Sequence, residues 1–167
     1  MSEETKSYVP SGASALTPYI CPRDAAKAIP WYVDVFGAVE EDQRYVDPSG
    51  KVGHAQIVID GAQIMLSDAF PDYGAESPEQ GNTTATFALN LYVPDADATV
   101  AAAERAGAVL QRPVEEQFYG SRMGTIIDPF GVRWMVATHV RDVSDAELDE
   151  AATEYAGSDE GPVQPVL

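Results

Sequence analysis

Short runs of alternating apolar and polar residues occur in the C-terminal half of the chain, and a turn sequence separates two of them. The runs are Arg122–Ile127 and Val132–Thr138, and the four residues Asp128–Gly131 lie between them. β-branched and aromatic residues at a period of two are typical of strands. Aspartate in the first position, proline in the second and glycine in the fourth are typical of a tight turn. The pattern therefore predicts a β-hairpin.

A similar pattern occurs once before, with offsets of 70 to 72 positions. The matched pairs are Gly61 and Gly131, Gly37 and Gly107, Ile64–Leu66 and Trp134–Val136, and Pro22 and Pro94. Because this period is too long for one repeat of a solenoid, it predicts two copies of one supersecondary module.

The remaining patterns give both modules the same order of elements. In the first, a strand at 16–21 precedes a helix that begins after Asp24 and ends at Gly37, although Pro30 is expected to kink or weaken it. In the second, Asp95 or Asp97 caps the helix. The other expected strands are 39–46, 84–93 and 109–115, and the first hairpin spans 53–68. We therefore predict an α+β fold: two tandem βαβββ modules forming a curved mixed sheet around a cleft, with helices on the outer face.

The composition of the segments between these elements suggests the domain boundaries. We expect a flexible arm at 1–14, the first module at 15–68, a linker at 69–83, the second module at 84–140 and an acidic tail at 141–167. The linker, which carries Phe70 and Tyr73, is expected to be a solvated loop, or alternatively a loop that folds an aromatic ring over a ligand. Residues 143–148 are compatible with the start of a short capped helix.

The charge of the chain excludes two classes of partner. The 27 acidic residues against 10 basic ones give a net charge of -17, which opposes binding to nucleic acid and to anionic membranes. No apolar segment is long enough to span a membrane, and no signal-peptide stretch is present, so a cytoplasmic location is expected. The acidic bias itself is compatible with a property of the host or with attraction of cationic ligands.

One face of the predicted strands is strongly apolar and should lie against the helices, whereas the other mixes polar, aromatic and methionine side chains. A solvated face would seldom carry Met65, Met135 and Tyr92 together. We therefore expect this mixed face to bind a small organic molecule through stacking, apolar contact and hydrogen bonds. The expected ligand-binding residues are Tyr19, His54, Gln56, Met65, Asn90, Tyr92, Arg122, Arg133 and Met135.

Several motifs together resemble those of the vicinal oxygen chelate superfamily, which includes glyoxalase I, bleomycin-resistance proteins and extradiol dioxygenases. They are Thr17-Pro-Tyr-Ile, Trp31-Tyr-Val-Asp-Val-Phe-Gly and Asp128-Pro-Phe-Gly. The run from Phe118 to Thr125, with Ala137-Thr-His-Val, is similar to the PhnB-like branch. The resemblance covers residues 15–140 and implies tandem βαβββ modules.

The resemblance also implies four metal-ligand positions, which here are Thr17, Met65, Ala88 and Met135. None supplies a carboxylate or imidazole, and thioethers suit soft ions, so we expect neither the usual divalent metal nor another cofactor. His54 and His139, with Glu115 or Glu116, remain an alternative metal site. The single cysteine, Cys21, excludes an internal disulfide and is expected to be a packed side chain rather than a nucleophile.

The sequence therefore favours a metal-free protein of the bleomycin-resistance type that holds a small molecule in the cleft between the modules. The alternatives are a metal-dependent lyase, isomerase or dioxygenase with a nonstandard site, a metal-free enzyme that uses His54 as acid–base, and a scaffold or regulatory domain without a ligand. Enzymatic activity stays open. We also expect a homodimer, since exposed sheet edges are normally paired or covered.

Overall fold

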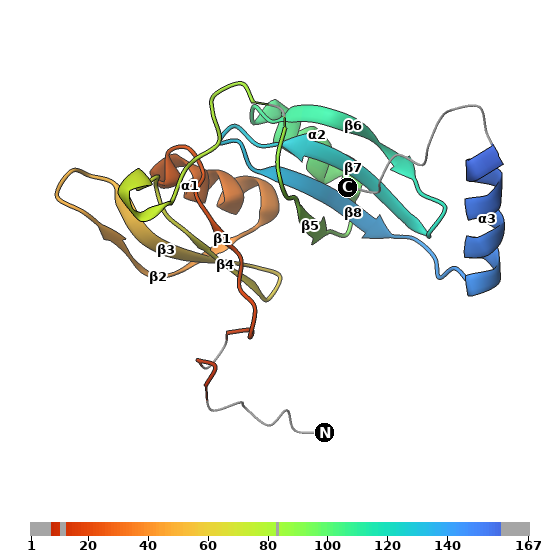
Figure 1. Cartoon of the computed structure of the whole chain (residues 1–167), viewed down its shortest axis with the longest axis horizontal. Coiled ribbons are helices and arrows are strands. Elements are labelled where there is room, and N and C mark those ends of the chain that lie inside the picture. The colour runs from red at the N-terminus through yellow and green to blue at the C-terminus, as the bar shows by residue number, and fades with distance from the viewer. Residues whose placement is uncertain (1–7, 11–12, 83, 158–167) are drawn as a thin grey trace. The chain divides into compact units, whose positions relative to one another are not determined.

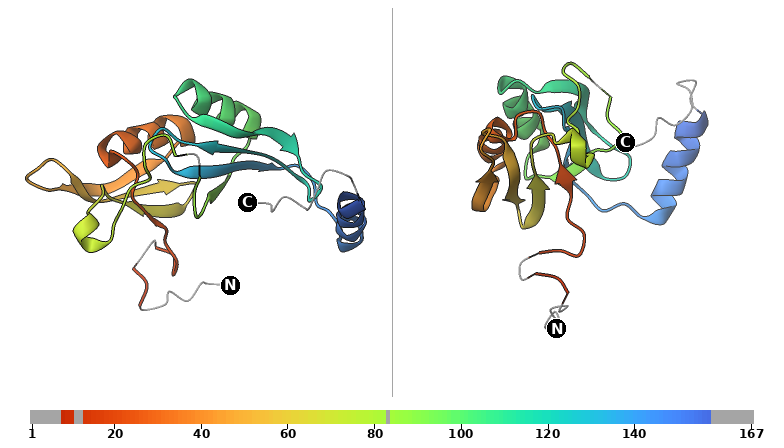
Figure 2. Two further views of the ribbon diagram at one scale, coloured as in Figure 1. Left: turned by 45° about the horizontal axis from the view of Figure 1, so that its top comes forward. Right: turned by 60° about the vertical axis from the view of Figure 1, so that its left-hand side comes forward.

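The computed structural model describes residues 8–10, 13–82 and 84–157. The chain forms two compact units: unit 1 comprises Met1–Thr83 with Phe130–Val132, and unit 2 comprises Thr84–Pro129 with Arg133–Leu167. Each unit contains one βαβββ series of elements, and in each the helix lies over one face of a four-stranded sheet (Figures 1 and 2). The predicted α+β fold of two tandem βαβββ modules is confirmed. The expected cleft stays a prediction.

Unit 1 has the strand order β1-β4-β3-β2. The strand β1 runs parallel to β4, and the other neighbours are antiparallel. The bounds are β1 Tyr19–Ile20, α1 Ala25–Phe36, β2 Val39–Val46, β3 Val52–Ile59, β4 Ala62–Leu66 and a 3-10 helix, η1, at Pro71–Tyr73.

Unit 2 repeats this topology with the order β5-β8-β7-β6, in which β5 and β8 are parallel and the other pairs antiparallel. The bounds are β5 Leu89–Tyr92, α2 Ala96–Arg105, β6 Val109–Glu116, β7 Ser121–Ile127, β8 Arg133–His139 and α3 Asp145–Gly157.

Both module helices begin where the sequence predicts. The side chain of Asp24 accepts a hydrogen bond from the Lys27 backbone N–H, and Asp95 caps α2 in the same way by accepting from Ala98. These carboxylates satisfy one of the N–H groups that a helix leaves unpaired in its first turn. The helix α1 runs unbroken through Pro30 to Phe36.

The core of each unit lies between its helix and one sheet face. In unit 1, Tyr32 of α1 packs near Phe130, with ring centroids 6.4 Å apart, and both belong to this unit. In unit 2, the buried Trp134 donates its indole N–H to the Asp128 carboxylate over 2.9 Å. The buried strand residues of the two units include Ile20, Ile57, Ile64 and Leu66 in unit 1, and Ile126, Trp134 and Val136 in unit 2.

Some predicted bounds were wrong. The strands expected at 16–21 and 84–93 shorten to the two residues of β1 and the four of β5, and Leu16 is 85% exposed. The helix expected to start within 143–148 does begin there, at Asp145, and runs through Gly157 as α3. Most of the predicted arm at 1–14 and residues 158–167 of the tail lie outside the described residues. Within the described ranges, no helix is long and apolar enough to cross a membrane.

Candidate functional site

The sheet face of unit 1 that lies away from α1, here called its open face, brings several predicted residues together. Tyr19 of β1 pairs in register with Met65 of β4, and Met65 pairs with Gln56 of β3. Register partners project to the same side of a sheet, so these three side chains are neighbours. Glu41 of β2 completes the row as the register partner of Gln56.

His54 lies beside this row on the same open face. Its ring centroid is 6.0 Å from that of Tyr19, and its register partner on β2 is Tyr45. The amide of Gln63 donates to Gln56 over 2.6 Å and to the Glu41 carboxylate over 3.3 Å. An acid, two amides, an imidazole and two phenols therefore line one sheet face. Sequence reasoning missed Glu41, whose position follows only from the strand register.

Unit 2 has an equivalent row on its own open face. Asn90 of β5 pairs with Met135 of β8, Met135 with Thr125 of β7, and Thr125 with Arg112 of β6. Tyr92 belongs to the next row, where its register partner is Ala137. The predicted residues Asn90, Tyr92 and Met135 therefore share a face. The row also contains Thr125 and Arg112, which sequence reasoning did not select.

Arg133 and Tyr119 extend the open face of unit 2. Arg133 is the register partner of Ile127, on the same side as Met135 two residues later. The Tyr119 hydroxyl lies 3.7 Å from the Met123 sulfur. Burial raises the pKa of Tyr119; the nearby Tyr92 phenol raises it further, and the Arg112 guanidinium opposes the shift. These interactions place Tyr119 beside the row, although the sequence alone gave no signal for it.

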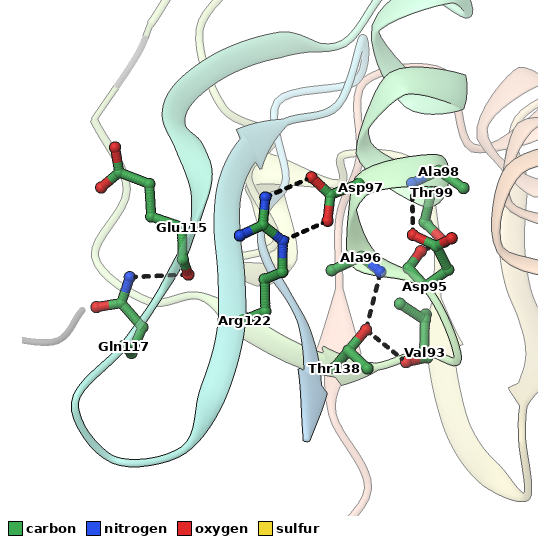
Figure 3. A network of polar contacts seen from close by, with 10 residues as sticks. All are labelled: Val93, Asp95, Ala96, Asp97, Ala98, Thr99, Glu115, Gln117, Arg122 and Thr138. Atoms are coloured by element: carbon green, nitrogen blue, oxygen red, sulfur yellow. Dashed lines mark hydrogen bonds and ion pairs between the residues drawn. The ribbon is translucent and has the colours of Figure 1, made fainter. Parts of the chain in front are cut away.

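Arg122 was expected on the open face, and this expectation is wrong. Arg122 pairs in register with Thr138, on the side of the sheet that α2 covers, and its guanidinium makes two bonds of 2.6 and 2.8 Å to Asp97 of that helix (Figure 3). A turn of only four residues would pair Ile127 with Val132, whereas the structure pairs Ile127 with Arg133. Because a slip of one residue exchanges the faces of a strand, Arg122 lies away from the predicted ligand face.

The four positions that the resemblance implies for a metal do not provide a suitable donor set. Met65 and Met135 carry thioethers, Ala88 has no donor, and the Thr17 hydroxyl is 3.5 Å from the backbone oxygen of Ser14. Zinc, nickel, manganese and iron in proteins are held by imidazole, thiolate or carboxylate groups. Across the part of the chain that the structure describes, no three His, Cys, Asp or Glu side chains are grouped to hold an ion.

The remaining candidates for chemistry have ordinary neighbours. The His139 Nε2 atom is 3.0 Å from the Asp142 carboxylate, and both side chains are exposed. The half-buried Cys21 has its sulfur 3.8 Å from the Ser67 hydroxyl. These contacts resemble a surface ion pair and a packed thiol, so neither supplies an identifiable nucleophile with its base.

Comparison with known proteins shows what the chain is similar to. An uncharacterized protein of Mycobacterium bovis is 39% identical over 141 residues, which cover 82% of this chain and 91% of that protein. The solved structure of a gene product from Arabidopsis thaliana has a TM-score of 0.59 and 25% identity, covering 74% of this chain and 98% of the other. A PhnB protein from Bacillus cereus, described as a putative 3-demethylubiquinone-9 3-methyltransferase, has a TM-score of 0.57 at 17% identity, covering 75% and 99%.

The family comparison covers most of both units. Residues 15–136 match the model of the Glyoxalase/Bleomycin resistance protein/Dioxygenase superfamily. This range includes β1 through most of β8, and therefore the open-face rows that contain Met65 and Met135. The chain belongs to the Glyoxalase/Bleomycin resistance protein/Dioxygenase superfamily.

Proposed function

We propose that the protein binds a small organic molecule on the open sheet faces and does so without the divalent metal of the superfamily's metal-dependent enzymes. The observation that carries the proposal is the equivalence of Met65 and Met135. Each methionine lies in the middle of an open-face row, 70 positions from the other, next to Tyr19 or Asn90.

The side chains around the two methionines suit an organic ligand. Tyr19 is 50% exposed and Tyr92 is 60% exposed, although both project from strands of a folded sheet. Aromatic rings and thioethers give apolar contact that adapts to the shape of a ligand, while Gln56 and Asn90 provide amides that fix its orientation. Such a face resembles a binding surface more than a solvated one.

The donor chemistry supports a metal-free site. A hard or borderline dication needs several nitrogen or oxygen ligands to replace its hydration shell, and the two methionines do not supply them.

The branch of the superfamily is also part of the proposal. We assign the chain to the PhnB-like branch on the motif between Phe118 and Thr125, and the fold likeness to the Bacillus cereus protein supports that assignment.

Ligand screening by NMR with methyl-labelled methionine tests the binding proposal. We expect aromatic ligands to shift the Met65 and Met135 methyl resonances, and we expect Tyr19→Ala and Met135→Ala to weaken this binding. Val33→Ala is a suitable control, because Val33 is exposed on α1 rather than on the open face. Ligands that shift neither methionine would contradict the proposal.

Metal analysis tests the second part of the proposal, which is that the protein binds its ligand without a divalent metal. After desalting, we expect less than stoichiometric zinc, nickel or manganese, and calorimetric titration with each ion should show no micromolar binding. Stoichiometric metal that is lost in Thr17→Ala or His54→Ala would instead favour the metal-dependent lyase, isomerase or dioxygenase alternative.

A further inference from the structure

The two open-face rows carry opposite charge at equivalent positions. In unit 1 the row ends at Glu41, the register partner of Gln56. In unit 2 the row ends at Arg112, the register partner of Thr125. Glu41 and Arg112 are 71 positions apart, so the duplicated sheets place a carboxylate on one open face where the other carries a guanidinium.

Thr125 is the second unusual feature of the row in unit 2. It lies on the inner strand β7 and is only 1% exposed, yet among the described residues its hydroxyl has no hydrogen-bond partner. Buried polar groups in folded proteins are almost always paired with protein or with an ordered molecule. The hydroxyl projects to the open-face side between Met135 and Arg112, its register partners. It is therefore available to donate to an acceptor that this face receives.

The guanidinium of Arg133 lies on the same face as that of Arg112. Arg133 lies two residues before Met135 on β8, which makes it the diagonal neighbour of Thr125. Diagonal neighbours in an antiparallel pair are about 7–8 Å apart, within reach of long side chains. Glu115, the register partner of Met123, places a carboxylate on this side, one row beyond Thr125. Two of the 10 basic residues of a chain with net charge -17 thus flank one unpaired hydroxyl.

We propose that the open face of unit 2 binds an organic acid. The oxyanion of the acid accepts a hydrogen bond from the Thr125 hydroxyl and pairs with Arg112 and Arg133. The apolar body of the acid contacts Met135 and the rings of Tyr92 and Tyr119. A guanidinium has five N–H donors, so each arginine can keep a contact within the protein and still bind the anion. This inference rests on the proposed function and specifies its ligand class.

Three matched probes test the charge preference: naphthalene-2-carboxylate, naphthalene-2-carboxamide and 2-naphthylmethylammonium. They share one apolar body and differ in charge. We expect calorimetric titration at low ionic strength to give the carboxylate about tenfold higher affinity than the amide, because hydrogen bonds to charged groups are stronger. The ammonium should bind more weakly than either. The naphthyl phosphate, as a fourth probe, distinguishes a phosphate site from a carboxylate site by which anion binds more tightly.

Variants in unit 2 locate the site. Arg112→Gln and Arg133→Gln should each weaken carboxylate binding by about fivefold or more and leave amide binding unchanged. Thr125→Val should also weaken carboxylate binding without lowering the melting temperature, because it removes an unpaired hydroxyl and preserves shape. Arg105→Gln is the control, since it removes one positive charge from the exposed last turn of α2.

The outcomes separate the two proposals. Equal affinity for the carboxylate and the amide would overturn the organic-acid inference. An equal loss of carboxylate affinity in Arg105→Gln and Arg112→Gln would also overturn it. If the amide or ammonium nevertheless shifts the methyl resonance of Met65 or Met135, the binding function stands. If none of the probes binds at millimolar concentration, both proposals fail.

Discussion

Asp68 and Thr138 lie 70 positions apart, and each ties the last strand of its unit to the N-terminus of the helix. The Asp68 carboxylate accepts from the Ala25 N–H over 2.8 Å, and the Thr138 hydroxyl accepts from the Ala96 N–H over 2.8 Å (Figure 3). Asp68 uses its second oxygen to accept from Val52, over 2.7 Å. The duplicated modules therefore keep one link and build it from different chemical groups.

Removing this link should lower the free energy of unfolding by different amounts in the two units. Asp68→Ala leaves the N–H groups of Ala25 and Val52 without an acceptor, at about 1–3 kcal/mol for each buried donor. Thr138→Val leaves only one N–H, that of Ala96, without an acceptor, at about 1–3 kcal/mol, and it also removes the hydrogen bond that the Thr138 hydroxyl donates to the Val93 carbonyl. Urea denaturation at neutral pH measures both. Thr153→Val in α3 is the control and should change the free energy of unfolding by less than about 0.5 kcal/mol. A larger cost for Thr138→Val than for Asp68→Ala would contradict this account.

Two equivalent glycines allow a matched test of crowding. Gly50 and Gly120 both have left-handed backbone, with φ of 88° and 83°. A methyl group at Gly50 would meet nothing within 4 Å, whereas at Gly120 it would overlap the Arg141 carbonyl oxygen. Gly50→Ala should therefore cost only the conformational strain of about 1–2 kcal/mol. Gly120→Ala should cost a further 1–3 kcal/mol, roughly, because the backbone of Arg141 must move. Equal destabilisation in urea would show that the contact at Gly120 relaxes without cost.

The same glycine limits where the tail can be shortened. The N–H groups of Val140 and Arg141 both donate to the Gly120 carbonyl, over 2.9 and 3.1 Å. We expect a chain that ends at Ser144 to keep its melting temperature within a few degrees, because it retains both bonds. A chain that ends at Val140 loses the Arg141 bond and the nearby Val143 side chain, so it should melt lower. If the two truncated chains have the same melting temperature, residues 141–144 contribute nothing to the stability of unit 2.

The ion pair of Arg122 and Asp97 predicts a pH dependence. The Arg122 guanidinium holds the pKa of Asp97 below its ordinary value. A lowered folded-state pKa stabilises the protein above the unfolded pKa, and this contribution is lost as pH falls through the folded pKa. The stability difference between the native chain and Arg122→Met should therefore be constant from pH 8 to about 5 and should shrink below about pH 4. A difference that is unchanged at pH 3 would mean that Arg122 stabilises through packing alone.

Local signals in the sequence were sufficient for much of the fold. Asp24 and Asp95 begin their helices as N-caps, and Gly37 ends α1 in the left-handed conformation that favours glycine. Each signal acts within a few residues, so it can be recognised without knowledge of tertiary contacts. The repeat of about 70 positions then gives the second unit the topology of the first.

Site residues depend on register, which the sequence determines less well. The prediction put Arg122 on the wrong face of β7 because Val132 lies in the turn rather than in β8. One extra residue in the turn changes which face of β7 meets α2. Thr125 and Arg112 are register partners, although 13 positions separate them along the chain. Their pairing includes a register shift between Leu110 and Arg112, which alternation in one strand does not reveal.

The outermost strands of both sheets predict self-association. Within the described residues of unit 1, β2 pairs with β3 alone, and it exposes 63% of Val39 and 64% of Tyr45. In the part of unit 2 that the structure describes, β6 has β7 as its single neighbour and exposes 53% of Val109. Edges that combine unpaired backbone groups with apolar side chains are usually covered by another chain or segment. We therefore expect a homodimer, with a sedimentation mass at micromolar concentration of about twice that of the chain.

Charged substitutions at these edges identify the strand that the second copy covers. Val39→Glu or Val109→Glu should shift the dimer toward monomer, because each adds a carboxylate to an interface of an already acidic chain. Val33→Glu on the exposed surface of α1 adds the same charge outside the sheet edges and should leave the mass unchanged. A native chain that sediments as a monomer would exclude the dimer. A dimer that withstands both edge substitutions would place the interface on another surface.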